Sequence, residues 1–331
     1  MAPSTITDRG VPAVVTNTAP VRSRLPRRLR ILILLVLTQG LKTALWSSVN
    51  PILGNELGAI SKIPEHDNML HPLAHLAYNT ATIALGWVLD YDYLDIGALT
   101  LVANAPYAYL LATYYNISLP TVAAFMNIEV ISIALPTFLL RPQSKIHDPN
   151  APLRNRYLIN SFQVQTATSL LAVGVYAVVI WSALKSDVLN PFIITHFDIP
   201  TLEFAHAETP ITIAWKVLTA GVAAKSFLLN PSIGAATGAV TPVHPFDPAT
   251  ATLPETVKQN VWFFTRRTRT LIRQTFILST FLLANTVQRC LTLQGADAIG
   301  AVGYSSVWIL ATVICAGWWT WVGNTETDID S

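Results

Sequence analysis

Residues 119–140 read LPTVAAFMNIEVISIALPTFLL, and Glu129 is the one ionisable residue in this otherwise apolar run. A transmembrane helix needs about 20 mostly apolar residues to cross roughly 30 Å of hydrocarbon. The run meets this requirement, so it predicts a helix that crosses a membrane and carries a carboxyl group near its middle. Similar apolar runs occur along the rest of the chain.

The composition of the whole chain is also that of a membrane protein. Of its 331 residues, 52% are hydrophobic and only 12% are charged, whereas an ordinary soluble domain has about 25% charged residues. The formal net charge is +2, which is too small for the clustered basic face of a nucleic-acid-binding protein. We therefore expect the lipid bilayer as a partner, and no nucleic acid.

The same length and polarity requirement identifies eight candidate spans. They cover roughly 31–50, 71–90, 96–115, 119–140, 165–185, 209–229, 270–291 and 301–322. The second, third and sixth are the least secure, because they contain His71 and His75, Pro106, and Lys216 with Lys225, respectively. The predicted fold class is therefore an all-α polytopic transmembrane helical bundle with seven or eight spans.

Basic residues near the spans predict the orientation of the chain, because short cytoplasmic loops carry the excess of Lys and Arg. We expect a disordered basic tail over 1–30, a transmembrane domain over 31–322 and an acidic tail over 323–331. Basic clusters precede the first span and occupy the connections 141–164 and 230–269. With eight spans, all three clusters are cytoplasmic, and so are both termini.

Glu129 is the strongest candidate for a functional residue. A charged group at membrane depth costs at least about 2.5–3.5 kcal/mol on insertion scales, so it needs a partner or a role. Apolar surroundings favour the neutral carboxylic acid, which can donate a proton. The alternative is that Glu129 pairs with a lysine and orders the bundle, and Lys42 in the first span is then its natural partner.

Polar and aromatic residues on the other expected spans recur at helical spacing, which places them on one side of each helix. If these sides face the interior, they line a polar cavity with aromatic walls. The candidate substrate-binding residues are Trp46, Lys42, Tyr78, Asn79, Asn104, Tyr107 and Trp215, and His75 is a further candidate for catalysis.

A purely structural interpretation of these residues competes with the functional one. Asn, Gln and His side chains also join helices through interhelical hydrogen bonds worth roughly 0.6 kcal/mol on average. Lys225 and Arg289 lie near the ends of expected spans, where long side chains reach back to the membrane surface. We therefore do not expect these two residues in the cavity.

The connection between the second and third expected spans contains the acidic motif DYDYLD at residues 90–95. Such motifs can hold Mg²⁺, because hard cations prefer carboxylate oxygens. Enzymes that ionise prenyl pyrophosphates usually present two such motifs, and the sequence has no second one. Three interpretations of the motif stay open: a metal site, a solvated loop, or the mouth of the cavity, where Asp95 is a candidate catalytic acid. We expect neither a metal nor another cofactor.

Asn116-Ile117-Ser118 is an N-glycosylation sequon. With eight spans it lies outside, in a very short turn beside the bilayer, where a transferase reaches it poorly. Asn116 is therefore a weak candidate for modification.

The basic tail, the segment LTQGLKTALW at 37–46, the buried Glu129 and the eight apolar spans together resemble the membrane proteins encoded in fungal indole-diterpene clusters, of the paxilline A and lolitrem S type. The resemblance covers the architecture of the whole chain. It implies a role in indole-diterpene biosynthesis at an internal membrane such as the endoplasmic reticulum, beside other membrane-bound pathway enzymes.

The chain is also similar to the small membrane-bound terpene cyclases of fungal meroterpenoid pathways. Those enzymes protonate an epoxide or olefin with a buried carboxylic acid and need no metal. They usually have seven spans and shorter chains, so only the role of the acid is carried over, to Glu129. The similarity implies a lipophilic prenylated substrate. Aromatic side chains would stabilise the carbocation that forms from this substrate.

Two other functional classes stay open. A non-catalytic carrier or scaffold for lipophilic intermediates would use the same cavity without a chemical step. A proton-coupled transporter would use Glu129 and His75 as relay groups.

Overall fold

The computed structural model describes residues 26–62, 70–151, 153, 155–235, 252–254, 256 and 266–325. Within these ranges every regular element is a helix, apart from one isolated β-bridge between Ser61 and Leu293. Five helices are long and apolar enough to cross a membrane, and a bent pair of helices would make a sixth. The predicted all-α fold with membrane-spanning helices is therefore confirmed at this level.

The long helices follow the order of the expected spans. They are α1 (Arg27–Ile60), α2 (Leu70–Val88), α3 (Tyr93–Thr113), α4 (Leu119–Leu140), α6 (Phe162–Lys185), α10 (Leu218–Ala235), α12 (Arg266–Cys290) and α13 (Ala298–Thr325). The short helices α5 (Arg156–Asn160), α7 (Leu189–His196), α8 (Glu203–Ala207) and α9 (Pro210–Lys216) lie in the connections or at a bend. Of the predicted disordered tail over 1–30, residues 27–30 instead belong to helix α1, and residues 1–25 lie outside the described residues. Most of the connection 230–269 and most of the tail 323–331 also lie outside them.

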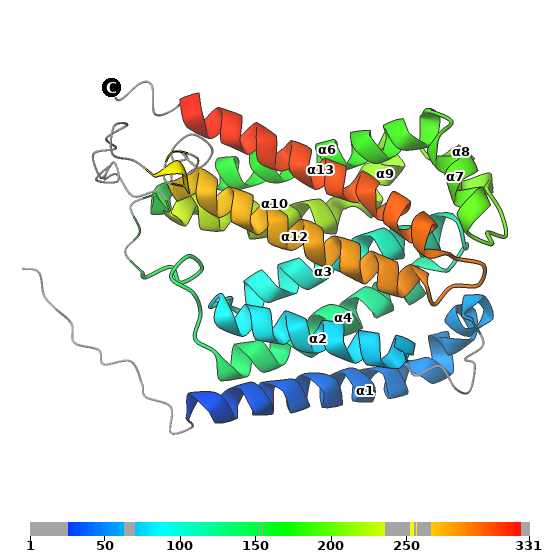
Figure 1. The fold of residues 1–331 in the computed structure, drawn as a ribbon, viewed down its shortest axis with the longest axis horizontal. Coiled ribbons are helices and arrows are strands. Elements are labelled where there is room, and N and C mark those ends of the chain that lie inside the picture. Colours follow the sequence, from blue (N-terminus) through cyan, green and yellow to red (C-terminus); the bar gives the residue numbers. More distant parts are fainter. Residues whose placement is uncertain are drawn as a thin grey trace, which may run out of the picture.

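Figure 1 shows the long helices running along the longest axis of the molecule and alternating in direction. The apolar helix α3 is at the centre, where it packs against α4, α10 and α12. Helix α1 packs on α4, and α2 lies against both α1 and α12. The first turn of α1, the start of α12 and the last turn of α13 lie at the same end of the bundle (Figure 1).

The sixth expected span is broken into two helices. Helices α9 and α10 meet at Val217 and are bent by 60°. Lys216 at the bend pairs with Glu208 and donates a hydrogen bond to the Thr113 hydroxyl 3.1 Å away. Because Glu208 is itself buried, the cation inside this predicted span has an anionic partner within the protein.

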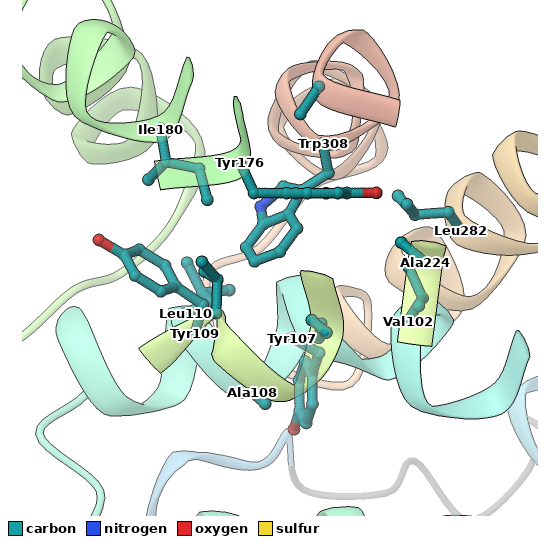
Figure 2. Packing of buried hydrophobic residues seen from close by; sticks show 14 of the residues in the cluster. Val102, Tyr107, Ala108, Tyr109, Leu110, Tyr176, Ile180, Ala224, Leu282 and Trp308 are labelled. Carbon is teal, nitrogen blue, oxygen red and sulfur yellow. The ribbon is translucent and has the colours of Figure 1, made fainter. Parts of the chain in front are cut away.

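Large aromatic side chains fill the core between α3, α6 and α13. The ring centroid of Trp308 lies 5.9 Å from those of Tyr109 and Tyr176 (Figure 2). Helices α6 and α10 approach closely, because Gly221 lies directly against the backbone of Val173. This packing holds α3 in the centre of the bundle, and α3 carries part of the candidate site.

Candidate functional site

An ionic cluster lies inside the bundle and consists of Lys42 on α1, Glu129 on α4 and Arg289 on α12. The Lys42 ammonium donates a hydrogen bond to Glu129 Oε2 at 2.8 Å. An Arg289 Nη atom lies 2.7 Å from Glu129 Oε1, so a cation faces each carboxylate oxygen. The side chain of Glu129 is only 5% exposed, so the pairing takes place away from solvent. Lys42 is therefore a partner of Glu129, as its position in the sequence suggests. The expectation of a neutral carboxylic acid needs correction, because Lys42 and Arg289 together stabilise the ionised carboxylate.

Helical spacing explains why these side chains meet. The buried residues of α4 include Phe125, Glu129 and Ser132, which recur every three or four positions and so lie on one face. On α1, Thr38 and Lys42 are buried and lie one turn apart. Since α1 packs on α4, these two faces bring Lys42 to Glu129.

His75 extends the ionic cluster to a fourth helix, α2. Its Nε2 lies 3.2 Å from the Lys42 Nζ. A charged lysine can only donate, so His75 accepts this hydrogen bond on Nε2 while Lys42 is charged. The contacts therefore link titratable groups from α2 through α1 to α4 and α12.

A small polar cavity adjoins the ionic cluster. Its volume is about 20 Å³, which is enough for about one water molecule. It is lined by Thr38, Lys42, Tyr78, Asn79, Thr82, Thr100, Asn104, Glu129, Ser132 and Ile133. Five of the candidate site residues predicted from the sequence therefore line one cavity: Lys42, Tyr78, Asn79, Asn104 and Glu129. Pockets for drug-sized ligands have volumes of about 300–1,000 Å³, so this cavity is closed to a prenylated substrate.

An aromatic group lies beside the cavity and is centred on Phe125. The ring centroid of Phe125 is 6.3 Å from Trp46 and 5.5 Å from Tyr107. The Arg289 guanidinium lies over the same ring at 5.1 Å. Trp46 and Tyr107 were predicted from the sequence as site residues, but Phe125 was not. Its position four residues before Glu129, on the same face of the helix, could have indicated it.

Trp215 does not belong to this site. It is on α9, its side chain is 76% exposed, and it does not line the cavity. The assignment of Trp215 to substrate binding therefore needs correction. The physical reason is the bend after α9, which a continuous sixth span would not have.

Arg289 also needs correction, because its side chain joins the ionic cluster. Lys225 does not line the cavity, as expected, but its side chain is buried in the protein. Arg289 contacts Glu129, and its side chain is 16% exposed. Lys225 is 2% exposed and donates hydrogen bonds to Gln165 and, at 3.0 Å, to Asn230. A position near the end of an apolar run therefore did not predict where these cations lie.

Asn285 is a signal for Arg289 in the sequence, since it lies four residues earlier on the same face of α12. The Asn285 amide donates hydrogen bonds to the Ala103 carbonyl at 2.8 Å and to Asn104 Oδ1 at 2.9 Å. Asn104 in turn donates to the Thr100 carbonyl at 2.8 Å. This network joins α12 to α3 beside the cavity.

Asp95 lies in a different place from Glu129, at the start of α3. The nearest residue of α3 that lines the cavity is Thr100, five residues further along, which is about 7.5 Å along the helix. Asp92 is the N-cap of α3, and it accepts hydrogen bonds at 3.0 Å from the backbone N–H groups of Leu94 and Asp95. Asp95 therefore does not line the Glu129 cavity, and its role as an acid at the mouth of the cavity stays a prediction.

Asp92, Asp95 and His147 form a second group of titratable residues, here called the acid–histidine cluster. His147 Nδ1 lies 2.7 Å from Asp92 Oδ2, and His147 Nε2 lies 4.0 Å from Asp95 Oδ1. Burial opposes ionisation of Asp92, but hydrogen bonds from His147 and from the backbone hold its pKa at about 2. Burial lowers the pKa of His147, yet the Asp92 hydrogen bond and the Asp95 charge raise it overall. Nothing in the sequence pointed to His147.

Asn116 is exposed in the turn between α3 and α4, with φ at 53°. Ser118 of the same sequon donates its hydroxyl hydrogen bond to Glu56 at 2.9 Å, and its backbone N–H to Glu56 at 3.2 Å. The sequon is therefore part of a tight, hydrogen-bonded turn, as its short spacing between two spans suggests.

Comparisons with known proteins identify no relative: no family model matches the chain, and neither a curated protein nor a solved structure matches it significantly.

Proposed function

We propose that the chain crosses an internal membrane eight times, with both termini in the cytoplasm. The spans are α1, α2, α3, α4, α6, the bent pair α9–α10, α12 and α13. Helices α2 and α12 are more polar than the others, but they pack against apolar spans, and their polar residues face the ionic cluster. The start of α1, the connection after α4 and the start of α12 are basic and lie at one end of the bundle (Figure 1), which supports a cytoplasmic location for that end.

Cysteine labelling tests this topology. The native Cys290 and Cys315 are fully buried, so they form a silent background for a membrane-impermeant maleimide. Asn150→Cys, at the basic end, should react in right-side-out microsomes, whose cytoplasmic face is accessible. Ser186→Cys, after α6, should react only once the membrane is permeabilised. Reaction of both variants in sealed microsomes would contradict the eight-span topology.

We propose that the protein acts in terpenoid secondary metabolism, most directly as a metal-independent cyclase of a lipophilic prenylated substrate. The observation that carries this proposal is the buried Glu129 carboxyl on the wall of a polar cavity with aromatic residues beside it. The resemblance to proteins of indole-diterpene clusters supports the substrate class. No cofactor is needed, because acid-initiated cyclisation is an isomerisation.

The ionic cluster can supply the proton. Transfer from Lys42 to Glu129 along their 2.8 Å hydrogen bond converts the ion pair into a neutral amine and a neutral acid. Glu129 then protonates the epoxide oxygen or the olefin, and in an epoxide the C–O bond breaks as the hydroxyl group forms. An olefin of the substrate attacks the resulting cation, and loss of a proton from the final cation to the Lys42 amine restores the ion pair.

The aromatic residues beside the cavity suit the cationic intermediate. The faces of Tyr78, which lines the cavity, and of Trp46 and Tyr107 can stabilise positive charge at short range. The cavity of about 20 Å³ has to widen before a substrate enters. Helices α1 and α2 are the natural elements to move, since they lie at the edge of the bundle away from α6 and α13 (Figure 1).

Proton-coupled transport is a second candidate, and one observation favours it. His75, Lys42, Glu129 and Arg289 form an unbroken series of contacts across four helices. Such a series can pass a proton between a lipophilic cargo site and another part of the protein. It requires no chemical change in the cargo, which separates it from the cyclase.

Product analysis distinguishes the two candidates. A host that makes linear and epoxidised prenyl-indole precursors receives the wild-type chain, Glu129→Gln, or the matched exposed variant Glu203→Gln, and each variant is checked for equal membrane expression. A cyclised isomer that forms with the wild type and Glu203→Gln, but not with Glu129→Gln, supports the cyclase. Unchanged products in all hosts would overturn it, and pH-gradient-driven uptake of the precursor into proteoliposomes would then support transport.

A further inference from the structure

We propose that Asp95 and His147, oriented by Asp92, bind one divalent cation of the zinc class at the start of α3. This inference concerns the acid–histidine cluster and is independent of the function proposed for Glu129. The three residues offer ligand atoms that lie within 4.8 Å of one another. All three side chains are at least nine-tenths buried.

Two buried atoms of the acid–histidine cluster, Asp95 Oδ1 and His147 Nε2, have no hydrogen-bond partner among the residues that the structure describes. Buried polar atoms are almost always paired, so each unpaired one needs an explanation. These two face each other at 4.0 Å. When the His147 proton is on Nδ1, Asp95 Oδ1 and His147 Nε2 both present lone pairs to each other. A cation between the two atoms would satisfy both of them.

The 4.0 Å separation of His147 Nε2 and Asp95 Oδ1 favours a bound metal ion over a direct hydrogen bond. A protonated His147 Nε2 would donate to Asp95 at about 2.7–3.2 Å, and 4.0 Å is too long for that bond. Zinc bonds to imidazole nitrogen at about 2.0–2.1 Å and to carboxylate oxygen at about 2.0–2.2 Å. A tetrahedral zinc ion bound to both atoms needs them about 3.4 Å apart, so the 4.0 Å gap has to close by about 0.6 Å when the ion binds.

Asp92 supplies the arrangement that usually surrounds a zinc-binding histidine. Such a histidine donates its other ring N–H to a carboxylate or carbonyl group, which fixes its tautomer and orientation. His147 Nδ1 lies 2.7 Å from Asp92 Oδ2, so Nε2 is the free nitrogen. Asp92 is itself fixed, because Oδ1 caps α3 and Oδ2 accepts the backbone N–H of Ser144 at 3.1 Å.

The loop that carries His147 is built before any ion binds. The Arg156 guanidinium donates to several backbone carbonyls of this loop, including Ile146 at 2.7 Å and Ala151 at 3.0 Å. Gln143 donates to the His147 carbonyl at 3.0 Å. His147 is thus held toward Asp95 by contacts that do not depend on the metal.

The donor set indicates the metal. Imidazole suits zinc and other transition metals better than Mg²⁺ or Ca²⁺, which prefer all-oxygen sites. Two side-chain ligands leave coordination positions for water, or for Asp92 Oδ2 after a small shift. Because the site joins the 141–155 loop to the start of α3, we assign it a structural role at this end of the bundle.

Zinc binding to the purified full-length protein in detergent tests the proposal. The protein is first treated with EDTA and desalted, then titrated with Zn²⁺ by calorimetry, and bound zinc is counted by mass spectrometry. The wild type should bind one equivalent and melt at a higher temperature with zinc. Asp95→Asn and His147→Gln should raise the Kd at least tenfold and lose the thermal shift.

Asp92→Asn and Asp90→Asn complete the set of variants. Asparagine caps a helix as well as aspartate does, so Asp92→Asn keeps α3 intact while it weakens the orientation of His147. Loss of an orienting group of this kind costs about 10- to 100-fold in metal affinity. Asp90→Asn makes the same chemical change at an exposed position of the same acidic motif, and it should bind zinc as the wild type does.

Two results would overturn the zinc site. One is wild-type protein that binds no zinc although it is folded, as judged by its melting curve and size-exclusion profile. The other is zinc binding that is undiminished in both Asp95→Asn and His147→Gln, which would place the ion elsewhere. Asp95→Asn should fold, because the asparagine oxygen can still accept the hydrogen bond from the Asp92 backbone N–H.

Discussion

Glu129 on α4 and Arg289 on α12 lie 2.7 Å apart inside the bundle, and Lys42 contacts the other oxygen of the same carboxylate. The ionic cluster therefore has two cations for one anion. This imbalance makes the three residues unequal: removing the anion leaves two facing cations, whereas removing Lys42 leaves a balanced pair. The consequences of this asymmetry can be measured.

Glu129→Gln should destabilise the protein more than Lys42→Met does. Breaking a buried ion pair by removing one partner costs about 3–5 kcal/mol, and here the loss leaves both Lys42 and Arg289 uncompensated. Lys42→Met removes one charged hydrogen bond, at the lower end of about 1.5–3 kcal/mol. The free energy of unfolding, measured by denaturant titration in detergent micelles, gives both values. The exposed control Glu203→Gln should change it by less than about 0.5 kcal/mol. Equal effects of the two cluster variants would mean that Arg289 does not share the carboxylate.

Asn285→Leu should lower the free energy of unfolding by about 1–3 kcal/mol. The change leaves the Ala103 carbonyl and Asn104 Oδ1 buried without their donor. The matched variant Asn127→Leu lies on the exposed face of α4 and gives up only a hydrogen bond to Ala123 within its own helix. It should be close to neutral in the same titration. A neutral Asn285→Leu would show that this network adds nothing to the packing of α12 on α3.

Gly221→Ala should destabilise the contact between α6 and α10. A Cβ at this position would lie 2.9 Å from the backbone atoms of Val173, so the helices would have to separate. Overpacking of this kind costs about 1–3 kcal/mol.

Gly174→Ala is the matched control for Gly221→Ala. It lies next to Val173 on α6, but nothing is within 4 Å of its Cβ position. Replacing a glycine inside a helix by alanine should there stabilise by about 0.5–1 kcal/mol. Thermal melting in detergent should thus shift in opposite directions for the two variants, and shifts in the same direction would contradict the close approach.

Trp46→Leu should lower product formation roughly tenfold if the protein is the proposed cyclase, because an aromatic face near the cation contributes up to about 2 kcal/mol when desolvated. Trp215→Leu should leave product formation unchanged, since Trp215 is exposed on α9. Both variants are compared at equal membrane expression in the product assay. Equal losses would return Trp215 to the substrate site.

The sequence by itself determined the helical class, the position of the long helices and the lysine partner of Glu129. Apolar runs and their interruptions are local properties, and a backbone in hydrocarbon has to satisfy its hydrogen bonds within a helix. Lys42 and Glu129 were identifiable for a related reason. An isolated charge inside an apolar run is costly, so two opposite charges on separate runs are expected to meet.

Only the tertiary structure decided which further residues join them. Arg289 lies near the end of its apolar run, so the sequence is compatible with a side chain at the membrane surface or in the interior. The packing of α12 on α3 places this side chain in the interior. Trp215 lies outside the site, contrary to the prediction, because of the bend after α9. His147 met Asp92 and Asp95 because the 141–155 loop folds back onto the start of α3. Such contacts depend on how helices and loops that are distant in the sequence pack together. Helical spacing in the sequence carries no information about that packing.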